Sequence, residues 1–402
     1  MSWYKEYGDE WKDIIETVAR EMGRTEQMIE KDTLQSMILF ELSKEDIPFV
    51  FKGGTSLSKA YGIIDRFSED IDLSLNRKPT ESEKKKVKDI IISIAERHGM
   101  QLLNPDEIKL RYDYNRYVFT YNSFFSSFPQ EIIIETSFYQ TSYPVELHEV
   151  KSYVGQFCQE RDIKMPIPFE AVIADMKVQS LERTFIDKVF AICDYRIQDV
   201  QDRDSRHLYD IAKLLPHVSL NQELDRLIDN VRDDRMQSKN NPSSSLAYNI
   251  PKMLEEIISS HFYEADYNSI TQKLLYEDMT YEEAIKNGIA IVANSDVFIY
   301  KKKKMKPKSP RSIELYNILK KRGYPEDFCD GITKNLNTDW TANRMIGYLS
   351  HYQKLSPEEI VDEMLAILSD RNRIMQKHAT QEANDKWNLI MAQGLGENLD
   401  EE

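Results

Sequence analysis

Cysteines and long apolar runs are scarce in this sequence of 402 residues, and it has no excess of positive charge. Cys158, Cys193 and Cys329 are odd in number and far apart, so we expect neither a disulfide framework nor a zinc site, and a reducing compartment fits best. No apolar run approaches the roughly 20 residues that a membrane-spanning helix needs. The first residues also lack the basic and apolar regions of a signal peptide. We therefore expect a cytoplasmic protein that makes no membrane contact.

Acidic residues outnumber basic ones, with 68 Asp and Glu against 53 Lys and Arg, which gives a formal net charge of −15. This balance argues against a protein that coats nucleic acid, but it is compatible with a local basic patch that binds RNA. Hydrophobic residues make up 41% of the chain. That content is enough for a real core, and the length suggests two or three domains.

Changes in composition divide the chain. Residues 300–311, "YKKKKMKPKSPR", combine a charge run with two prolines and are the best linker candidate. Residues 1–178 mix helix and strand patterns, residues 179–299 are mostly helical, and residues 312–402 are helical throughout. Within the second region, the polar, turn-rich residues 238–249 suggest a mobile loop. The predicted fold class is α+β, with a mixed β-sheet core flanked by helices, then a helical region and a small all-α C-terminal domain.

Local patterns predict individual elements. Residues 47–53 form a short apolar run typical of a buried strand, and residues 69–75, "EDIDLSL", alternate polar and apolar like a second strand. Residues 80–99 predict a helix that begins with a capping box and ends at a glycine. Residues 107–124 suggest paired strands, and residues 130–139 suggest another strand.

Two glycines, Gly53 and Gly54, stand between the first strand and a helix. Glycines there let the backbone bend sharply and approach a ligand without a Cβ in the way. Free N–H groups at the helix start, with the hydroxyls of Thr55 and Ser56, suit a phosphate. The alternative is a purely structural turn, so this pattern needs support from elsewhere in the sequence.

Carboxylates supply that support. Side chains alternate along a strand, so Asp70 and Asp72 share one face, where they repel each other unless a cation lies between them. Magnesium prefers oxygen ligands and is usually held by one or two carboxylates with substrate phosphates. On the strand at 130–139, Glu135 is a third candidate, preferred to Glu131 because it lies further inside the strand. The alternative is a solvated acidic edge.

Later helices carry further candidates. Lys188 falls within an apolar helical stripe, and an inward ammonium needs a partner or a function because burying it alone is costly. It could instead snorkel to solvent. On the next helix, Arg206, Asp210 and Lys213 lie opposite the apolar face, where a solvated salt-bridge face is the alternative. Lys59, in the helix after the glycines, could steer phosphates or only solubilise that helix.

These motifs resemble a known family. The segment "KGGTSL…RFSEDIDL", within residues 52–73, is similar to the first motif of the AbiEii/AbiGii-type nucleotidyltransferases of the DNA polymerase β-like superfamily. The helical segments "SLERTFIDKVFAICDYR" and "SRHLYDIAKLL" resemble two later motifs of the same family. The resemblance covers residues 3–298. One departure is His207, where many relatives have an aspartate.

The resemblance implies a Mg²⁺-dependent nucleotidyltransferase core, in which two ions assist transfer of an NMP from an NTP to an acceptor hydroxyl. Together with the residue patterns, it assigns three overlapping sets. The nucleotide would be bound by Gly53, Gly54, Thr55, Ser56, Lys188 and Arg206. The metal would be bound by Asp70, Asp72 and Glu135. The catalytic residues would be Asp70, Asp72, Glu135, Lys188 and Asp210.

The resemblance further implies a toxin of a toxin–antitoxin or abortive-infection phage-defence system, with a cognate antitoxin as partner and an RNA 3′ end, such as that of tRNA, as acceptor. Two alternatives stay open: nucleotidyl transfer to a small molecule, as in antibiotic-inactivating relatives, and a non-catalytic nucleotide-binding interaction protein. The segment after residue 310 carries no pattern to which a mechanism can be attached.

Overall fold

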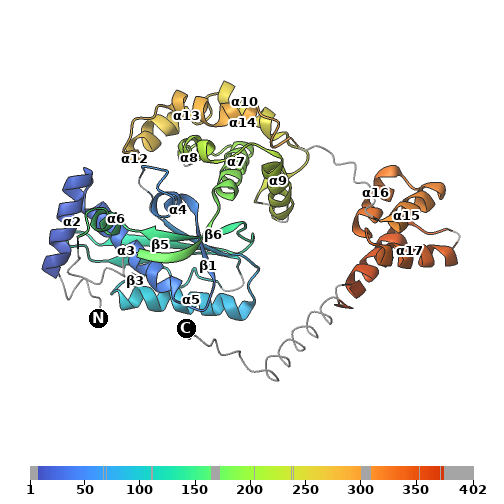
Figure 1. Cartoon of the computed structure of the whole chain (residues 1–402), viewed down its shortest axis with the longest axis horizontal. Coiled ribbons are helices and arrows are strands. Elements are labelled where there is room, and N and C mark those ends of the chain that lie inside the picture. Colours follow the sequence, from blue (N-terminus) through green and yellow to red (C-terminus); the bar gives the residue numbers. More distant parts are fainter. Residues whose placement is uncertain are drawn as a thin grey trace, which may run out of the picture. The chain divides into compact units, whose positions relative to one another are not determined.

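The computed structural model describes residues 8–66, 68, 70–109, 112–163, 173–202, 204–236, 238, 240–299, 309–352, 354–371 and 373–374. The chain forms two compact units, residues 1–300 and 301–402 (Figure 1). The predicted linker lies outside the described residues except for its last three. The domain boundaries predicted inside the first unit stay predictions.

A mixed sheet forms the centre of the first unit. Within the described residues it has seven strands, in the order β3-β4-β5-β2-β1-β7-β6. The strands are β1 (Phe49–Lys52), β2 (Asp70–Leu75), β3 (Gln101–Leu102), β4 (Tyr114–Tyr121), β5 (Gln130–Ser137), β6 (Val145–Lys151) and β7 (Ile173–Gln179). Strand β2 is parallel to β5 and β1 is parallel to β7, while the other neighbours are antiparallel. The α+β prediction with a mixed sheet is therefore confirmed.

Alternation along β2 separates an apolar face of the sheet from a charged face. Ile71, Leu73 and Leu75 are buried in a hydrophobic cluster, so Asp70 and Asp72 lie on the opposite face. The same cluster contains buried side chains of helices α2 (Gly8–Met22), α3 (Glu26–Ser43), α5 (Glu81–Arg97) and α6 (Tyr153–Glu160). Helix α5 begins with the predicted capping box between Thr80 and Glu83, which confirms the helix start.

The first unit is mostly helical after Ser180, as predicted. The longer helices are α7 (Leu181–Ile197), α8 (Arg206–Leu214), α9 (Gln222–Arg235), α10 (Ile250–Ser259) and α13 (Tyr281–Asn287). The shorter ones are η2 (Leu215–His217), η3 (Pro242–Ser244), α11 (Glu264–Asp266), η4 (Tyr267–Thr271), α12 (Gln272–Leu274) and α14 (Ile289–Ala293). Their apolar faces form a second cluster, which also includes Leu57 of helix α4 (Gly53–Lys59). Figure 1 shows this helical half on the side of the sheet that carries α4.

Two local predictions are wrong, and one feature was missed. Residues 107–124 contribute one strand, β4, rather than a pair, because the Asn115 side chain bonds both the N–H and the carbonyl of Lys109 in a loop. Strands β6 and β7 were not expected. The segment 238–249 is not a free loop within its described residues, since Ser243 and Ser244 are fully buried and the Ser243 N–H donates to Asp194 Oδ1 at 2.7 Å.

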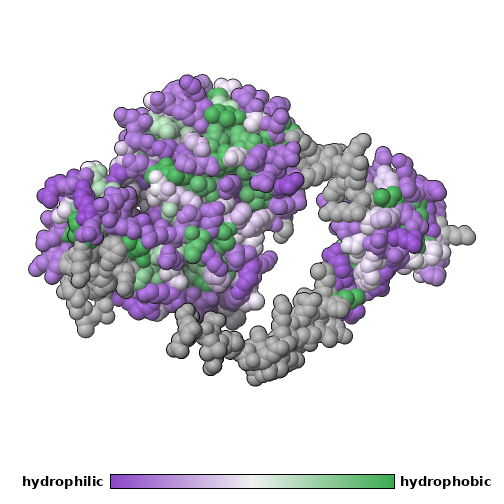
Figure 2. Space-filling view, viewed as in Figure 1, coloured by the Kyte–Doolittle hydropathy of each residue, from purple (hydrophilic) through white to green (hydrophobic). Residues whose placement is uncertain are grey.

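The second unit is helical throughout its described residues, as predicted. It contains α15 (Pro310–Lys321), α16 (Glu326–Asn335), α17 (Asp339–His351) and a helix over residues 357–371. That last helix begins with Ser356 and Glu359 bonded reciprocally, as in a capping box. No helix in the described part of the chain has the length and apolar character needed to cross a bilayer. Figure 2 shows a largely hydrophilic surface on the face in view, interrupted by smaller apolar areas.

Candidate active site

The turn between β1 and α4 brings two glycines against charged side chains. Gly53 has a φ of +76°, and a Cβ placed on it would lie 1.9 Å from Asp72 Oδ2. A Cβ on Gly54 would lie 2.4 Å from Arg66 Nη2. A side chain at either position would force the Asp72 carboxylate or the Arg66 guanidinium to shift, because real atoms do not approach so closely. The glycines therefore allow the backbone to touch the Asp72 carboxylate and the Arg66 guanidinium directly.

The three predicted metal ligands lie on adjacent strands. Asp70 and Asp72 belong to β2, and Glu135 on β5 is the direct neighbour of Asp72 in the parallel register. Burial raises the pKa of the Asp72 carboxyl to about 7, and the negative charge of Glu135 adds to the increase. Two carboxylates on neighbouring strands repel each other, which favours a cation between them.

The carboxylate set fits a magnesium ion that arrives with phosphates. Among the described residues, no group of three or more His, Cys, Asp or Glu side chains is gathered so as to hold a metal by itself. Magnesium, however, is usually held by one or two carboxylates together with substrate phosphates. Asp72 and Glu135 supply such a pair, and Asp70 lies on the same strand face as Asp72.

A buried ion-pair cluster centres on Asp210. Its carboxylate accepts bonds from Arg66 Nε at 2.7 Å and Arg66 Nη2 at 2.8 Å. Lys188 Nζ donates to Asp210 Oδ2 at 2.6 Å and lies 3.4 Å from His207 Nδ1. Arg66 is 2% exposed, Lys188 is 6% exposed and Asp210 is fully buried. The solvated-face alternative for Asp210 and the snorkelling alternative for Lys188 are therefore wrong.

Burial and charge shift the titration of this cluster in different directions. Burial would raise the pKa of the Asp210 carboxyl, but Arg66 and Lys188 outweigh it and hold that pKa well below its usual value. Burial lowers the pKa of the Lys188 ammonium, and Asp210 offsets the decrease only in part. Burial and the positive charge of Lys188 lower the pKa of His207 to about 4. At neutral pH the site thus holds an ionised Asp210 and a neutral His207.

A cavity of about 460 Å³ opens between the charged face of the sheet and the helical half. Three predicted site residues line it, namely Gly53, Asp72 and Lys188. The other described residues that line it are Lys52, Tyr139, Gln140, Gln179, Thr184, Asp187, Ala191, Asp194, Tyr195, Gln198, His207, Arg235, Asn240 and Asn241. Segments far apart in the sequence therefore meet at one polar cavity.

Sequence reasoning missed a second charged cluster in this cavity. Arg235 bonds Asp187 at 3.4 Å and Asp194 at 2.5 Å. Gln179 Nε2 donates to Asp187 Oδ2 at 3.2 Å. The sequence of α7 did contain a signal for this cluster. Small and acidic residues recur there at intervals of three and four, the spacing of one helix face: Thr184, Asp187, Ala191 and Asp194. Arg235, 41 residues beyond Asp194, carries no comparable signal.

Two hydroxyls predicted to bind phosphate are used inside the protein. Thr55 Oγ1 bonds Ser68 Oγ at 2.7 Å and donates to the Asp70 carbonyl at 2.5 Å. Ser56 Oγ donates to the Gly53 carbonyl at 2.8 Å. Thr55 is 2% exposed and Ser56 is fully buried. Both side chains thus shape the turn in this structure, and their role toward phosphate stays a prediction.

Two candidate residues of α8 are not among the residues that line the cavity. Arg206, the first residue of that helix, is half-buried and is not among the described residues lining the cavity. Its role in nucleotide binding stays a prediction. Lys213 pairs with Glu277 at 2.9 Å, so its charge is neutralised outside the cavity.

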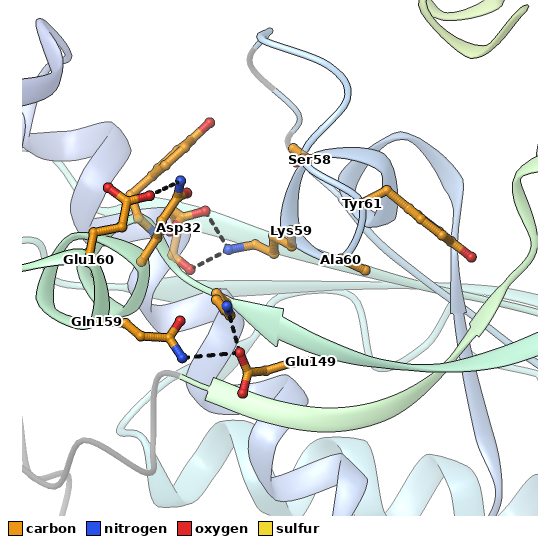
Figure 3. Close-up of a pocket in the computed structure, with 12 residues that line it drawn as sticks. Asp32, Ser58, Lys59, Ala60, Tyr61, Glu149, Gln159 and Glu160 are labelled. Carbon is orange, nitrogen blue, oxygen red and sulfur yellow. Dashed lines mark hydrogen bonds and ion pairs between the residues drawn. The ribbon is translucent and has the colours of Figure 1, made fainter. Parts of the chain in front are cut away.

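Lys59 neither faces the cavity nor solubilises its helix. Its ammonium is buried, pairs with the Asp32 carboxylate, and donates to the Asp32 carbonyl at 2.8 Å and to Ser36 Oγ at 2.9 Å. Figure 3 shows this contact beside a polar pocket formed by α3, α4, β6 and α6. Asp32 in turn accepts from the Tyr153 N–H at 2.7 Å. Lys59 therefore fastens the far end of α4 to α3, and both expectations for it are wrong.

Comparison with known proteins points to one family. A family model described as the AbiEii nucleotidyl transferase toxin of type IV toxin–antitoxin systems matches residues 37–287. No curated protein matches the chain. Among solved structures, JHP933 from Helicobacter pylori has 18% identity over 67% of this chain and 91% of its own, with a TM-score of 0.37. MenT4, a nucleotidyltransferase toxin from Mycobacterium tuberculosis, has 18% identity over 70% of this chain and 90% of its own, with a TM-score of 0.42.

These structural similarities are low, and the assignment depends on the family model. That model covers more than half of the chain and includes the glycine turn, the three strand carboxylates, Lys188 and Asp210. The chain belongs to the AbiEii family of nucleotidyltransferase toxins.

Proposed function

We propose that this nucleotidyltransferase transfers an NMP from an NTP to the 3′ end of an RNA, specifically a tRNA, with Mg²⁺ as cofactor. The observation that carries the proposal is the cavity of about 460 Å³ that joins Gly53, Asp72 and Lys188. A polar cavity of this size can hold a nucleotide, and its carboxylate and fixed lysine are groups that phosphoryl transfer uses. Family membership supports the reaction class, and the acceptor and the metal are our proposals.

The triphosphate binds at the end of the cavity that Gly53, Asp72 and Lys188 line. Asp70, Asp72 and Glu135 would hold Mg²⁺, which when bound would supply positive charge to the phosphate oxygens. Lys188 adds a positive charge whose position is fixed, because its Nζ lies 2.6 Å from Asp210 Oδ2. Fixed charge of this kind stabilises a negatively charged transition state without reorganisation.

The acceptor hydroxyl attacks the α-phosphorus and forms the new phosphate ester bond. Its proton passes to Glu135, which lies next to Asp72 in the sheet. The bond from the α-phosphorus to the bridging oxygen breaks, and pyrophosphate leaves with the electron pair. In this scheme Asp210 positions Lys188 through their ion pair rather than touching the substrate.

As a member of a toxin family, the protein would act in the cytoplasm and be restrained by a cognate antitoxin. Modification of tRNA ends would stop translation, which fits a role in abortive infection and phage defence.

The test is label transfer from each of the four α-³²P-labelled nucleoside triphosphates to total RNA in the presence of Mg²⁺, followed by sequencing of RNA 3′ ends. Label should appear on tRNA and should be lost in Asp72→Asn. Asp175→Asn, which removes an exposed carboxylate on β7, is the matched control and should retain transfer.

Transfer that survives Asp72→Asn would contradict the metal and carboxylate assignment. Label that appears on added aminoglycoside but not on RNA would replace the RNA acceptor by a small molecule. Label on neither acceptor, with intact folding, would contradict the proposed reaction.

A further inference from the structure

Four charged residues form a row across neighbouring strands. Lys52 on β1 is opposite Asp72 on β2, Asp72 is beside Glu135 on β5, and Glu135 is opposite Arg116 on β4. Directly paired residues share a face of the sheet, with Cβ atoms about 5 Å apart. The row therefore reads positive, negative, negative, positive, and the two candidate metal ligands lie between two cations.

The two ends of this charged row differ in their partners. Arg116 Nε lies 3.5 Å from Glu135 Oε1, so its charge is already engaged. Lys52 lines the cavity, and within the described part of the chain no carboxylate comes within ion-pair distance of its ammonium. Lys188 and Arg235, which also line the cavity, are both paired. Lys52 thus brings a cation to the cavity that no described carboxylate neutralises.

The position of Lys52 places that charge at the glycine turn. It is the last residue of β1 and directly precedes Gly53, whose backbone touches the Asp72 carboxylate. It lies opposite Asp72 in the antiparallel register of the sheet and lines the same cavity as Asp187 of α7. Lys52 therefore shares the cavity with carboxylates of both β2 and helix α7.

We infer that Lys52 is a substrate-contacting residue that binds the phosphate chain of the nucleoside triphosphate. A lysine ammonium on a flexible stem is a suitable point charge for phosphate. Lys188 already donates one of its three N–H groups to Asp210, which leaves room for a second lysine on the phosphate chain. The inference rests on the proposed function and adds to it a role for Lys52, the first residue of the quoted motif, to which the sequence analysis assigned none.

The test compares triphosphate with monophosphate binding in the full chain. Isothermal titration calorimetry is carried out with Mg²⁺ and the four ribonucleoside α,β-methylene triphosphates, and then with the four nucleoside monophosphates. Lys52→Met should weaken the best triphosphate about tenfold to hundredfold, as expected for one charge-assisted hydrogen bond. It should change monophosphate binding much less, and Lys52→Arg should restore part of the loss. Lys85→Met, which removes an exposed charge on α5, should change neither.

A structural role for Lys52 predicts another pattern, in which both nucleotide classes weaken alike and Lys52→Arg restores neither. That pattern, or unchanged triphosphate binding in Lys52→Met, would overturn the inference. If Lys52→Met does not fold, Lys52→Gln and Lys52→Arg give the same comparison. Failure of the wild-type protein to bind any triphosphate would instead contradict the proposed function. The two failures can therefore be told apart.

Discussion

Three charged groups, Arg66, Lys188 and Asp210, are buried together at the cavity, which Lys188 lines. The two cations share the Asp210 carboxylate through three direct hydrogen bonds of 2.6 to 2.8 Å. A buried pair adds little stability over apolar residues, but removing one partner is costly, because the other charge remains buried. The cluster therefore matters more for the position of Lys188 than for folding as such.

Asp210→Ala should lower the free energy of unfolding by about 3–5 kcal/mol, because it leaves Arg66 and Lys188 buried without their carboxylate. Denaturant unfolding of the full chain measures this change. Asp175→Ala, at an exposed site on β7, should lie within about 0.5 kcal/mol of wild type. A loss below about 1 kcal/mol for Asp210→Ala would mean that the cations find water or new partners.

His207 should give the first unit an acid-sensitive contribution to stability. Its folded-state pKa is about 4, below the usual value of 6.5. The unfolded state therefore binds the proton first, and the stability is present above about pH 6.5 and is lost as the pH falls toward 4. NMR titration of the imidazole should find it neutral at pH 5.5.

His207→Gln should lose less stability than wild type between pH 7 and pH 5, since the substitution removes the proton that His207 binds in the unfolded state. His217→Gln, at an exposed position, is the control and should behave like wild type. Equal pH dependence of all three proteins would contradict the assignment.

At the scale of elements, helix α4 connects the active site to the N-terminal helices. Its first residue, Gly53, touches Asp72, and its last residue, Lys59, is fastened to Asp32 of α3. The hydroxyls of Thr55 and Ser56 bond within the turn and to β2. Both ends of this short helix are therefore fixed, which keeps the glycine turn in place beside the strand carboxylates.

Gly53→Ala should abolish label transfer, because its Cβ would meet Asp72 Oδ2 at 1.9 Å. Gly62→Ala is a matched control, since Gly62 also has a positive φ, +65°, but nothing lies within 4 Å of the added Cβ. That control should lose only about 1–2 kcal/mol of stability to backbone strain and should keep its activity. Activity in Gly53→Ala equal to that in Gly62→Ala would show that Asp72 can move aside without loss.

At the scale of the whole molecule, the chain contains two compact units with separate cores. The third hydrophobic cluster consists only of residues from 315 to 368, and the first two contain none of them. All of the candidate active site, from Gly53 to Arg235, lies in the first unit. Chemistry and the helical C-terminal unit are therefore separable in principle.

A protein that ends at residue 300 should fold and retain label transfer within about twofold of the full chain, because no part of its cores is removed. Thermal unfolding should show one transition for this fragment and a further one in the full chain. Loss of transfer in a folded fragment would assign the C-terminal unit to substrate binding. Failure to fold would show that the two cores depend on each other.

Short-range patterns determined much of what the sequence could predict. Alternation placed Asp70 and Asp72 on the face opposite Ile71 and Leu73, and the helix beginning after Thr80 followed from its own capping residues. The helical nature of both later regions followed from periodicity. These features depend on residues within a few positions of one another, so the chain needs no tertiary context to specify them.

Only the tertiary structure decided which charges meet. Arg66 and Asp210 are 144 residues apart in sequence, and Lys52, Asp72 and Glu135 become neighbours through the strand order. The same patterns that predicted a solvated face for Asp210 are compatible with full burial, because a polar helix face can be covered by another part of the chain. Sequence periodicity gives the direction of a side chain relative to its own element, whereas its partner depends on long-range packing.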